Sequence, residues 1–119
     1  MPAPRPVALL LEDEPLIAMD AEQTLEGAGF AVVTVTTSAA AHRFLDRATP
    51  AVAIVDIVLR DGPCHTLAER LAQRQIPFVV HSGDQASHHA DTPFAAGTWL
   101  GKPAAAEELR AAVTLAAPG

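Results

Sequence analysis

The stretch Val7–Ala18 reads VALLLEDEPLIA, and it contains both kinds of element from which the fold is built. Its first five residues are all apolar, which is typical of a strand buried on both faces. The acidic pair Glu12–Asp13 follows, and Pro15 then stands at an early helical position. This order predicts an α/β unit with acidic side chains at the carboxyl end of its strand.

The same alternation continues along the rest of the chain. Apolar and β-branched runs predict further strands at Ala31–Val35, Ala51–Asp56, Phe78–Ser82 and Thr98–Lys102. Helical spacing of apolar residues predicts helices at about residues 15–28, 38–48, 67–72 and 104–116. Segment 83–96 has only scattered apolar residues, so we expect a short or degenerate fourth helix there. Strands that alternate with helices in this way predict a doubly wound parallel α/β sheet.

Composition limits the classes of protein to which the chain can belong. With 119 residues and 50% hydrophobic content, it is expected to form one domain over residues 1–119, with a core at about 7–116. Its apolar runs are far shorter than the roughly 20 residues that span a bilayer, and the first residues lack the apolar region of a signal peptide. The single cysteine, Cys64, fits a reducing compartment, so we expect a cytoplasmic protein. A net charge of -6 argues against non-specific nucleic-acid binding.

Polar side chains stand at the ends of four of the predicted strands. They are Glu12, Asp13, Asp56, Ser82 and Lys102. Because the carboxyl ends of parallel strands meet at one rim, we expect a single pocket with three carboxylates, a hydroxyl and an ammonium. Asp13 and Asp56 are the expected neighbours of Mg²⁺, which prefers hard oxygen ligands, and Glu12 could hold one of its waters. Such a pocket suits attack by a carboxylate on phosphorus, with Lys102 and the metal neutralising the phosphoryl oxygens.

Four motifs in this order resemble a response-regulator receiver domain of two-component signalling. They are VALLLEDEPLIA, AIVDIVLRDG, FVVHSG and WLGKP, and the resemblance runs from Val7 to Leu115. It implies a flavodoxin-like (βα)5 fold with strand order 2-1-3-4-5. It also implies that Asp56 is the phosphoacceptor, and that Asp13, Asp56 and the main-chain carbonyl of Val58 ligate Mg²⁺, or Mn²⁺, with Glu12 completing the acidic pocket.

The resemblance also assigns roles to residues near the end of the chain. Ser82 takes the position of the switch hydroxyl and Lys102 that of the invariant lysine, with a cis Lys102–Pro103 bond. Trp99 stands where receivers carry a Tyr or Phe that moves inward on activation, and its larger ring is a departure from that pattern. Asp84, near the pocket mouth, and Val58 are expected to influence water access to the acyl-phosphate.

These roles imply a signalling function with named kinds of partner. A histidine kinase or a histidine phosphotransfer protein would phosphorylate Asp56, and a surface would then change its affinity for a downstream protein. We expect a stand-alone receiver, monomeric or weakly dimeric, that binds neither nucleic acid nor membrane and is no enzyme beyond the chemistry of its own aspartate. A fragment of a longer protein stays an alternative, as does a pseudo-receiver that only binds partners. A phosphatase or phosphotransferase with an Asp nucleophile is a further alternative, although such an enzyme typically has a second Asp where this chain has Val58.

Simpler interpretations remain open for individual residues. Asp56 could be an ordinary strand-end acid, Ser82 a turn cap and Trp99 a packed aromatic at the sheet edge. We expect His81 to be a hydrogen-bonded core histidine. His88 and His89 are adjacent, so on a helix they would point apart and could not chelate a metal together. Ser38 is the expected N-cap of the second helix.

Overall fold

The computed structural model describes residues 4–117, so residues 1–3 and 118–119 of the predicted domain lie outside the described part. Five strands form one sheet with the order β2-β1-β3-β6-β7, and every neighbouring pair is parallel. The strands are β1 (Val7–Leu11), β2 (Ala31–Val35), β3 (Val52–Val55), β6 (Phe78–Ser82) and β7 (Thr98–Gly101). Without the short β4 and β5, this order is the predicted 2-1-3-4-5, and the doubly wound fold is confirmed.

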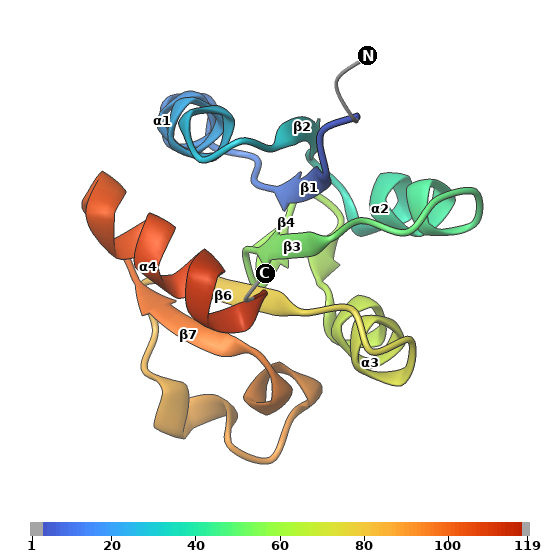
Figure 1. The fold of residues 1–119 in the computed structure, drawn as a ribbon. Helices are drawn as coiled ribbons and strands as arrows, with labels where there is room; N and C mark the ends of the chain where they lie inside the picture. Colours follow the sequence, from blue (N-terminus) through green and yellow to red (C-terminus); the bar gives the residue numbers. More distant parts are fainter. Residues whose placement is uncertain (1–3, 118–119) are drawn as a thin grey trace.

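Helices cover both faces of the sheet (Figure 1). Helices α1 (Pro15–Gly27) and α4 (Ala106–Ala116) lie on one face, and α2 (Ser38–Leu45) and α3 (His65–Gln73) on the other. In β1, Leu9 and Leu11 belong to the core under α2 and α3, whereas Ala8 and Leu10 belong to the core under α1 and α4. Successive side chains of a strand point to opposite faces of the sheet. Because helices cover both faces here, side chains on both sides of β1 are buried, and its sequence is continuously apolar.

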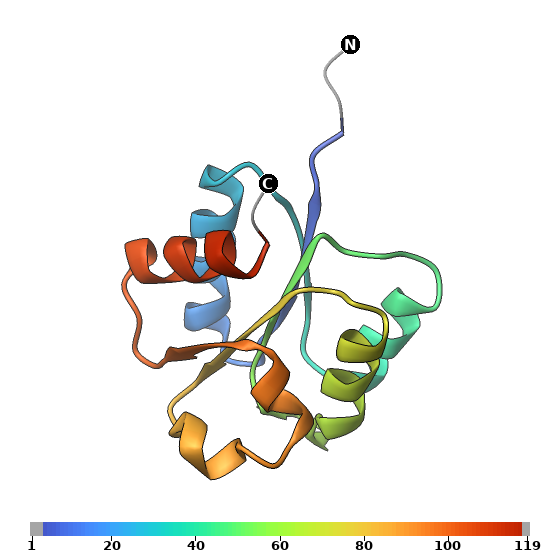
Figure 2. The same ribbon diagram turned by 60° about the horizontal axis from the view of Figure 1, so that its bottom comes forward.

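The predicted fourth helix is replaced by two turns of 3₁₀ helix, η1 (Ala86–His89) and η2 (Pro93–Ala96). They follow β6, and η2 lies beside α3 in Figure 2, whereas η1 lies farther from that helix. Phe94 in η2 is completely buried in the core shared with α2 and α3. The expected degenerate helix is therefore confirmed, but its second half is anchored more firmly than its scattered apolar residues indicate.

The start of α2 differs from the expectation. Thr37, not Ser38, is the N-cap, and its hydroxyl accepts a hydrogen bond from the N–H of Ala40 at 3.1 Å. The N–H and hydroxyl of Ser38 instead donate to the carboxylate of Asp61, at 2.9 and 3.0 Å. Asp61 lies in the turn of a small hairpin, β4 (Val58–Leu59) with β5 (Gly62–Pro63), which the sequence did not indicate. These hydrogen bonds hold the pKa of Asp61 below its usual value, and the one from the Ser38 N–H has the largest effect.

Among the helices of the described residues, none has the length and apolar content needed to cross a membrane.

Candidate functional site

The register of the sheet brings the predicted polar residues to one rim. Leu11 of β1 lies beside Val55 of β3, and Ser82 of β6 lies beside Gly101 of β7. The residues at these strand ends, and those directly after them, therefore lie at the same edge of the sheet. The side chains at this edge are Glu12, Asp13, Asp56, Ser82 and Lys102.

Three carboxylates form the centre of the site. Oxygen atoms of Glu12, Asp13 and Asp56 lie within 4.8 Å of one another. Glu12 is almost completely buried, whereas Asp13 and Asp56 are partly open to solvent. Carboxylates this close repel one another strongly unless a cation lies between them. Their hard oxygen atoms match the ligands that Mg²⁺ prefers.

Lys102 supplies the positive charge that the cluster needs. Its Nζ donates to Oε1 of Glu12 at 2.8 Å and to Oδ2 of Asp56 at 3.3 Å. Burial alone would lower the pKa of Lys102, but its hydrogen bond to Glu12 and the charge of Asp56 raise it overall. Burial raises the pKa of Asp56, and Lys102 only partly opposes this. The ammonium therefore stays charged and neutralises a buried glutamate while it touches the more open Asp56.

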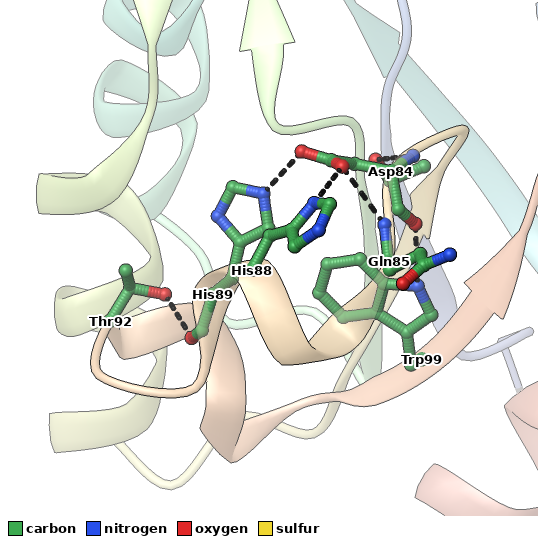
Figure 3. Close-up of polar contacts among 7 residues, drawn as sticks. Asp84, Gln85, His88, His89, Thr92 and Trp99 are labelled. Carbon is green, nitrogen blue, oxygen red and sulfur yellow. Dashed lines mark hydrogen bonds and ion pairs between the residues drawn. The ribbon is translucent and has the colours of Figure 1, made fainter.

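Ser82, Asp84 and Trp99 form a second group of contacts at the rim. The buried Ser82 hydroxyl accepts a hydrogen bond from the N–H of Asp84 at 3.0 Å. The carbonyl of Asp84 in turn accepts one from the indole Nε1 of Trp99 at 3.2 Å. Ser82 is thus linked to Trp99 through the main chain of Asp84. The Asp84 carboxylate contacts His88 and His89 (Figure 3).

Two expectations about the histidines are wrong. His88 and His89 do not point apart, because Nδ1 of His88 and Nε2 of His89 reach the two oxygens of one Asp84 carboxylate, at 2.7 and 2.8 Å. One ring uses its near nitrogen and the other its far nitrogen, in a 3₁₀ turn rather than a regular α-helix. His81 is buried as expected, but its Nε2 has no hydrogen-bond partner among the described residues. Burial, and after it the charge of Lys102, lowers the pKa of His81, which favours the neutral ring.

The remaining predicted residues lie close to the rim. Val58 begins β4, two residues after Asp56, and its side chain is more than half exposed. The Lys102–Pro103 peptide bond is cis. Pro103 also lines a pocket of about 340 Å³ between α1 and α4, together with His81 and Lys102.

Cys64 supports the main chain of the site, a role that no pattern in the sequence indicates. Its thiol is placed to donate to two carbonyl oxygens, with Sγ 3.1 Å from that of Asp56 and 3.3 Å from that of Ile57. The thiol therefore stabilises the main chain at Asp56 and Ile57, and with it the position of the Asp56 side chain. A lone small residue before a helix carries no pattern that predicts such a contact.

The Cys64 thiol should react very slowly with a disulfide reagent such as DTNB in the native protein. Burial raises its pKa from 9.0 to about 12, and only the thiolate attacks the reagent. Each pKa unit is a tenfold change, so ionisation alone should slow labelling about a thousandfold at pH 8. The labelling rate in buffer would be compared with that in concentrated urea, and similar rates would contradict the buried contact.

Comparisons with known proteins identify the fold and the family. The family model described as "Response regulator receiver domain" matches residues 8–114. A putative response regulator from Chloroflexus aurantiacus is 26% identical and has a TM-score of 0.83, with 98% of this chain and 100% of that chain covered. SdrG from Sphingomonas melonis is 35% identical over 96% of this chain and 97% of its own, with a TM-score of 0.75.

A third structure shares the fold at lower identity. The receiver domain of the sensor histidine kinase PA1611 from Pseudomonas aeruginosa is 20% identical, with a TM-score of 0.83 over 98% of this chain and 100% of that chain. That structure has a magnesium ion coordinated in its active site cleft. The search of curated proteins found no match. The family model covers residues 8–114, which include the rim and all of the sheet except Val7. The chain therefore belongs to the response regulator receiver domain family.

Proposed function

We propose that this receiver accepts a phosphoryl group on Asp56 and thereby switches a protein–protein interaction surface. The observation that carries the proposal is the place of Asp56 at the rim. Its carboxylate lies within 4.8 Å of those of Glu12 and Asp13 and 3.3 Å from Nζ of Lys102. Carboxylates packed beside one fixed ammonium suit a reaction that brings in a cation and a phosphoryl group.

The donor set fits Mg²⁺, or Mn²⁺, as the resident cation. Asp13, Asp56 and the main-chain carbonyl of Val58 would hold the metal, and Glu12 would hold one of its waters. When bound, the metal would neutralise phosphoryl oxygens and relieve the repulsion among the three carboxylates. The magnesium ion in the PA1611 receiver domain supports this choice.

In the proposed phosphoryl transfer, Asp56 is the nucleophile, and Lys102 and Ser82 bind the phosphoryl oxygens. A carboxylate oxygen of Asp56 forms a bond to the phosphorus of a phosphohistidine, the P–N bond breaks, and the donor imidazole leaves and takes up a proton. The donor is a histidine kinase or a histidine phosphotransfer protein. Lys102, already 3.3 Å from Asp56, would bind a phosphoryl oxygen, and the Ser82 hydroxyl would turn toward another.

The consequence of phosphorylation is a change of surface rather than turnover of a substrate. Ser82 and Trp99 would reorganise, and the face formed by the 3₁₀ turns, β7 and α4 would change its affinity for a downstream protein. Asp84 and Val58 would tune the lifetime of the acyl-phosphate. We propose a cytoplasmic, monomeric or weakly dimeric signalling module. Val58 stands where an Asp-nucleophile phosphatase typically has its acid, so we favour the receiver over that enzyme.

Incubation with acetyl phosphate, followed by intact mass spectrometry, tests the proposal. The wild type should gain a single phosphoryl group with Mg²⁺ and none in EDTA, and Asp56→Asn should gain none. Asp91→Asn, a change at an exposed aspartate, is the matched control and should behave like the wild type. Equal phosphorylation of Asp56→Asn would overturn the proposal. Failure to bind Mg²⁺ would favour a partner-binding pseudo-receiver, and steady turnover of a phosphate ester would favour a phosphatase.

A further inference from the structure

Asp61 joins the chain segment that follows Asp56 to the start of α2. Its Oδ1 accepts from the N–H of Ser38 at 2.9 Å, and its Oδ2 accepts from the Ser38 hydroxyl at 3.0 Å and from the N–H of Ala39 at 3.1 Å. The first N–H groups of a helix have no partner within the helix, so one carboxylate here supplies the acceptors for two of them. Its negative charge also lies at the helix end where the macrodipole favours it.

The helix that Asp61 contacts is itself firmly held. Phe44 and Leu45 of α2 are buried in the core that α2 shares with α3. The hydroxyl of its N-cap, Thr37, accepts only the N–H of Ala40, the third residue of the helix. The N-cap and Asp61 therefore share the task of binding the free N–H groups, and Asp61 is attached to an element that the core fixes.

The hairpin that carries Asp61 also carries the proposed main-chain metal ligand. Val58 begins β4 and lies opposite Pro63 of β5. Pro63 has no N–H and cannot donate to the Val58 carbonyl. The N–H of Cys64, the next residue, donates at 3.1 Å to the carbonyl of Ile57 instead. The residue opposite Val58 therefore leaves its carbonyl oxygen open to a ligand.

A hairpin this short needs support from outside. Strands β4 and β5 have two residues each, and an isolated two-stranded hairpin is marginally stable at best in water. The Leu59 side chain is buried, but that of Val58 is more than half exposed, so packing fixes only one of the two residues of β4. Cys64 holds the base of the hairpin through the carbonyls of Asp56 and Ile57, and the Asp61 carboxylate holds its turn.

We propose that Asp61 is a positioning residue, whose contact with the start of α2 holds the β4–β5 hairpin in the conformation that presents the Val58 carbonyl to the metal. The presentation of a metal ligand rests on the proposed function, whereas the anchoring of the hairpin to α2 does not. A hairpin that samples other conformations binds a metal more weakly, because the apparent Kd rises as the competent fraction falls. Loss of the Asp61 carboxylate must therefore weaken Mg²⁺ binding, although both of its oxygens are bound to α2.

The first experiment measures the anchor without metal. The N–H of Arg60, beside Asp61 in the turn, donates to the Thr36 carbonyl at 3.3 Å, so its exchange with water reports whether the turn stays against the start of α2. NMR in EDTA should show about fivefold faster exchange of this N–H in Asp61→Ala, the factor expected for one net hydrogen bond. Asp61→Asn keeps one acceptor oxygen and Ser38→Ala removes only one donor, so both should change it less. Unchanged exchange in folded Asp61→Ala would overturn the anchor.

The second experiment measures Mg²⁺ affinity by NMR titration in high salt, which screens the loss of charge at position 61. Asp61→Ala should bind Mg²⁺ about fivefold more weakly than the wild type, and Asp61→Asn should lie between them. Thr37→Ala is the matched control, because it removes a cap of the same helix without touching the hairpin, and it should lower the urea midpoint but keep the wild-type affinity.

The outcomes separate this proposal from the proposed function. Wild-type affinity in folded Asp61→Ala, or an equal loss of affinity in Thr37→Ala, would overturn the positioning role while the metal site stands. If the wild type itself binds no Mg²⁺, the proposed function fails and the positioning of Val58 fails with it. The exchange measurement in EDTA still decides in that case whether Asp61 anchors the hairpin.

Discussion

Replacing Lys102 with methionine should lower the free energy of unfolding by about 3–5 kcal/mol, the range for breaking a buried ion pair by removal of one partner. Lys102 is the partner that lies 2.8 Å from Oε1 of Glu12, whose side chain is only 2% exposed. Without the ammonium, a buried carboxylate remains beside two others. Urea unfolding in EDTA measures the change, because bound Mg²⁺ would replace part of the missing charge. The variant should also fail to gain a phosphoryl group.

A double variant separates the loss of stability from the loss of function. Glu12→Gln combined with Lys102→Met leaves no unpaired buried charge at this pair, so most of the stability should return. Phosphorylation should not return, because Lys102 is proposed to bind the phosphoryl group. A single Lys102→Met variant as stable as the wild type would show that the pair does not hold Glu12 in place. Full phosphorylation of that variant would remove Lys102 from the proposed chemistry.

Replacing Phe94 with alanine should cost about 3–5 kcal/mol, because it leaves a cavity in the core. The Phe94 side chain is completely buried, and it contacts the rings of His65 and His89 at centroid distances of 4.9 and 5.9 Å. Its loss should therefore also release the segment of 3₁₀ turns from α3. Denaturant unfolding measures the cost, and hydrogen exchange of residues 83–97 measures the release.

Phe30 is the matched control for this substitution. It is half-buried and packs at the margin of the other core, so Phe30→Ala should cost less and leave exchange in residues 83–97 unchanged. We expect the amides of η2 in the wild type to exchange more slowly than those of η1, because Phe94 anchors only η2. Equal and rapid exchange in both turns would contradict the anchoring role of Phe94.

The sequence predicts the sheet and the rim well because both follow from short-range patterns. A continuous apolar run such as Val7–Leu11 is a strand buried on both faces, and the residue that follows it must leave the sheet at the carboxyl edge. Glu12 and Lys102, 90 positions apart, thus meet at 2.8 Å without any special signal between them. Parallel pairing alone brings them to one edge.

The details that the sequence misses depend on tertiary contacts and on turn geometry. Ser38 looks like a helix cap, but its hydroxyl donates to the carboxylate of Asp61, 23 positions away. Thr37 is the N-cap instead. His88 and His89 look divergent on a regular helix, yet the 3₁₀ turn and the choice of ring nitrogen let them reach one carboxylate. The contact of Cys64 with the Asp56 carbonyl has the same origin. Local propensity cannot predict any of these partners.

Chemical mapping of the phosphoryl group tests the central claim most directly. Protein treated with phosphoramidate and Mg²⁺ would be reduced with sodium borohydride, which converts an aspartyl acyl-phosphate to homoserine, and then sequenced by peptide mass spectrometry. We predict homoserine at position 56 alone, and none when Mg²⁺ is withheld. Homoserine at position 13, or a phosphoryl group that resists borohydride on a serine or histidine, would contradict the assignment of Asp56 as the phosphoacceptor.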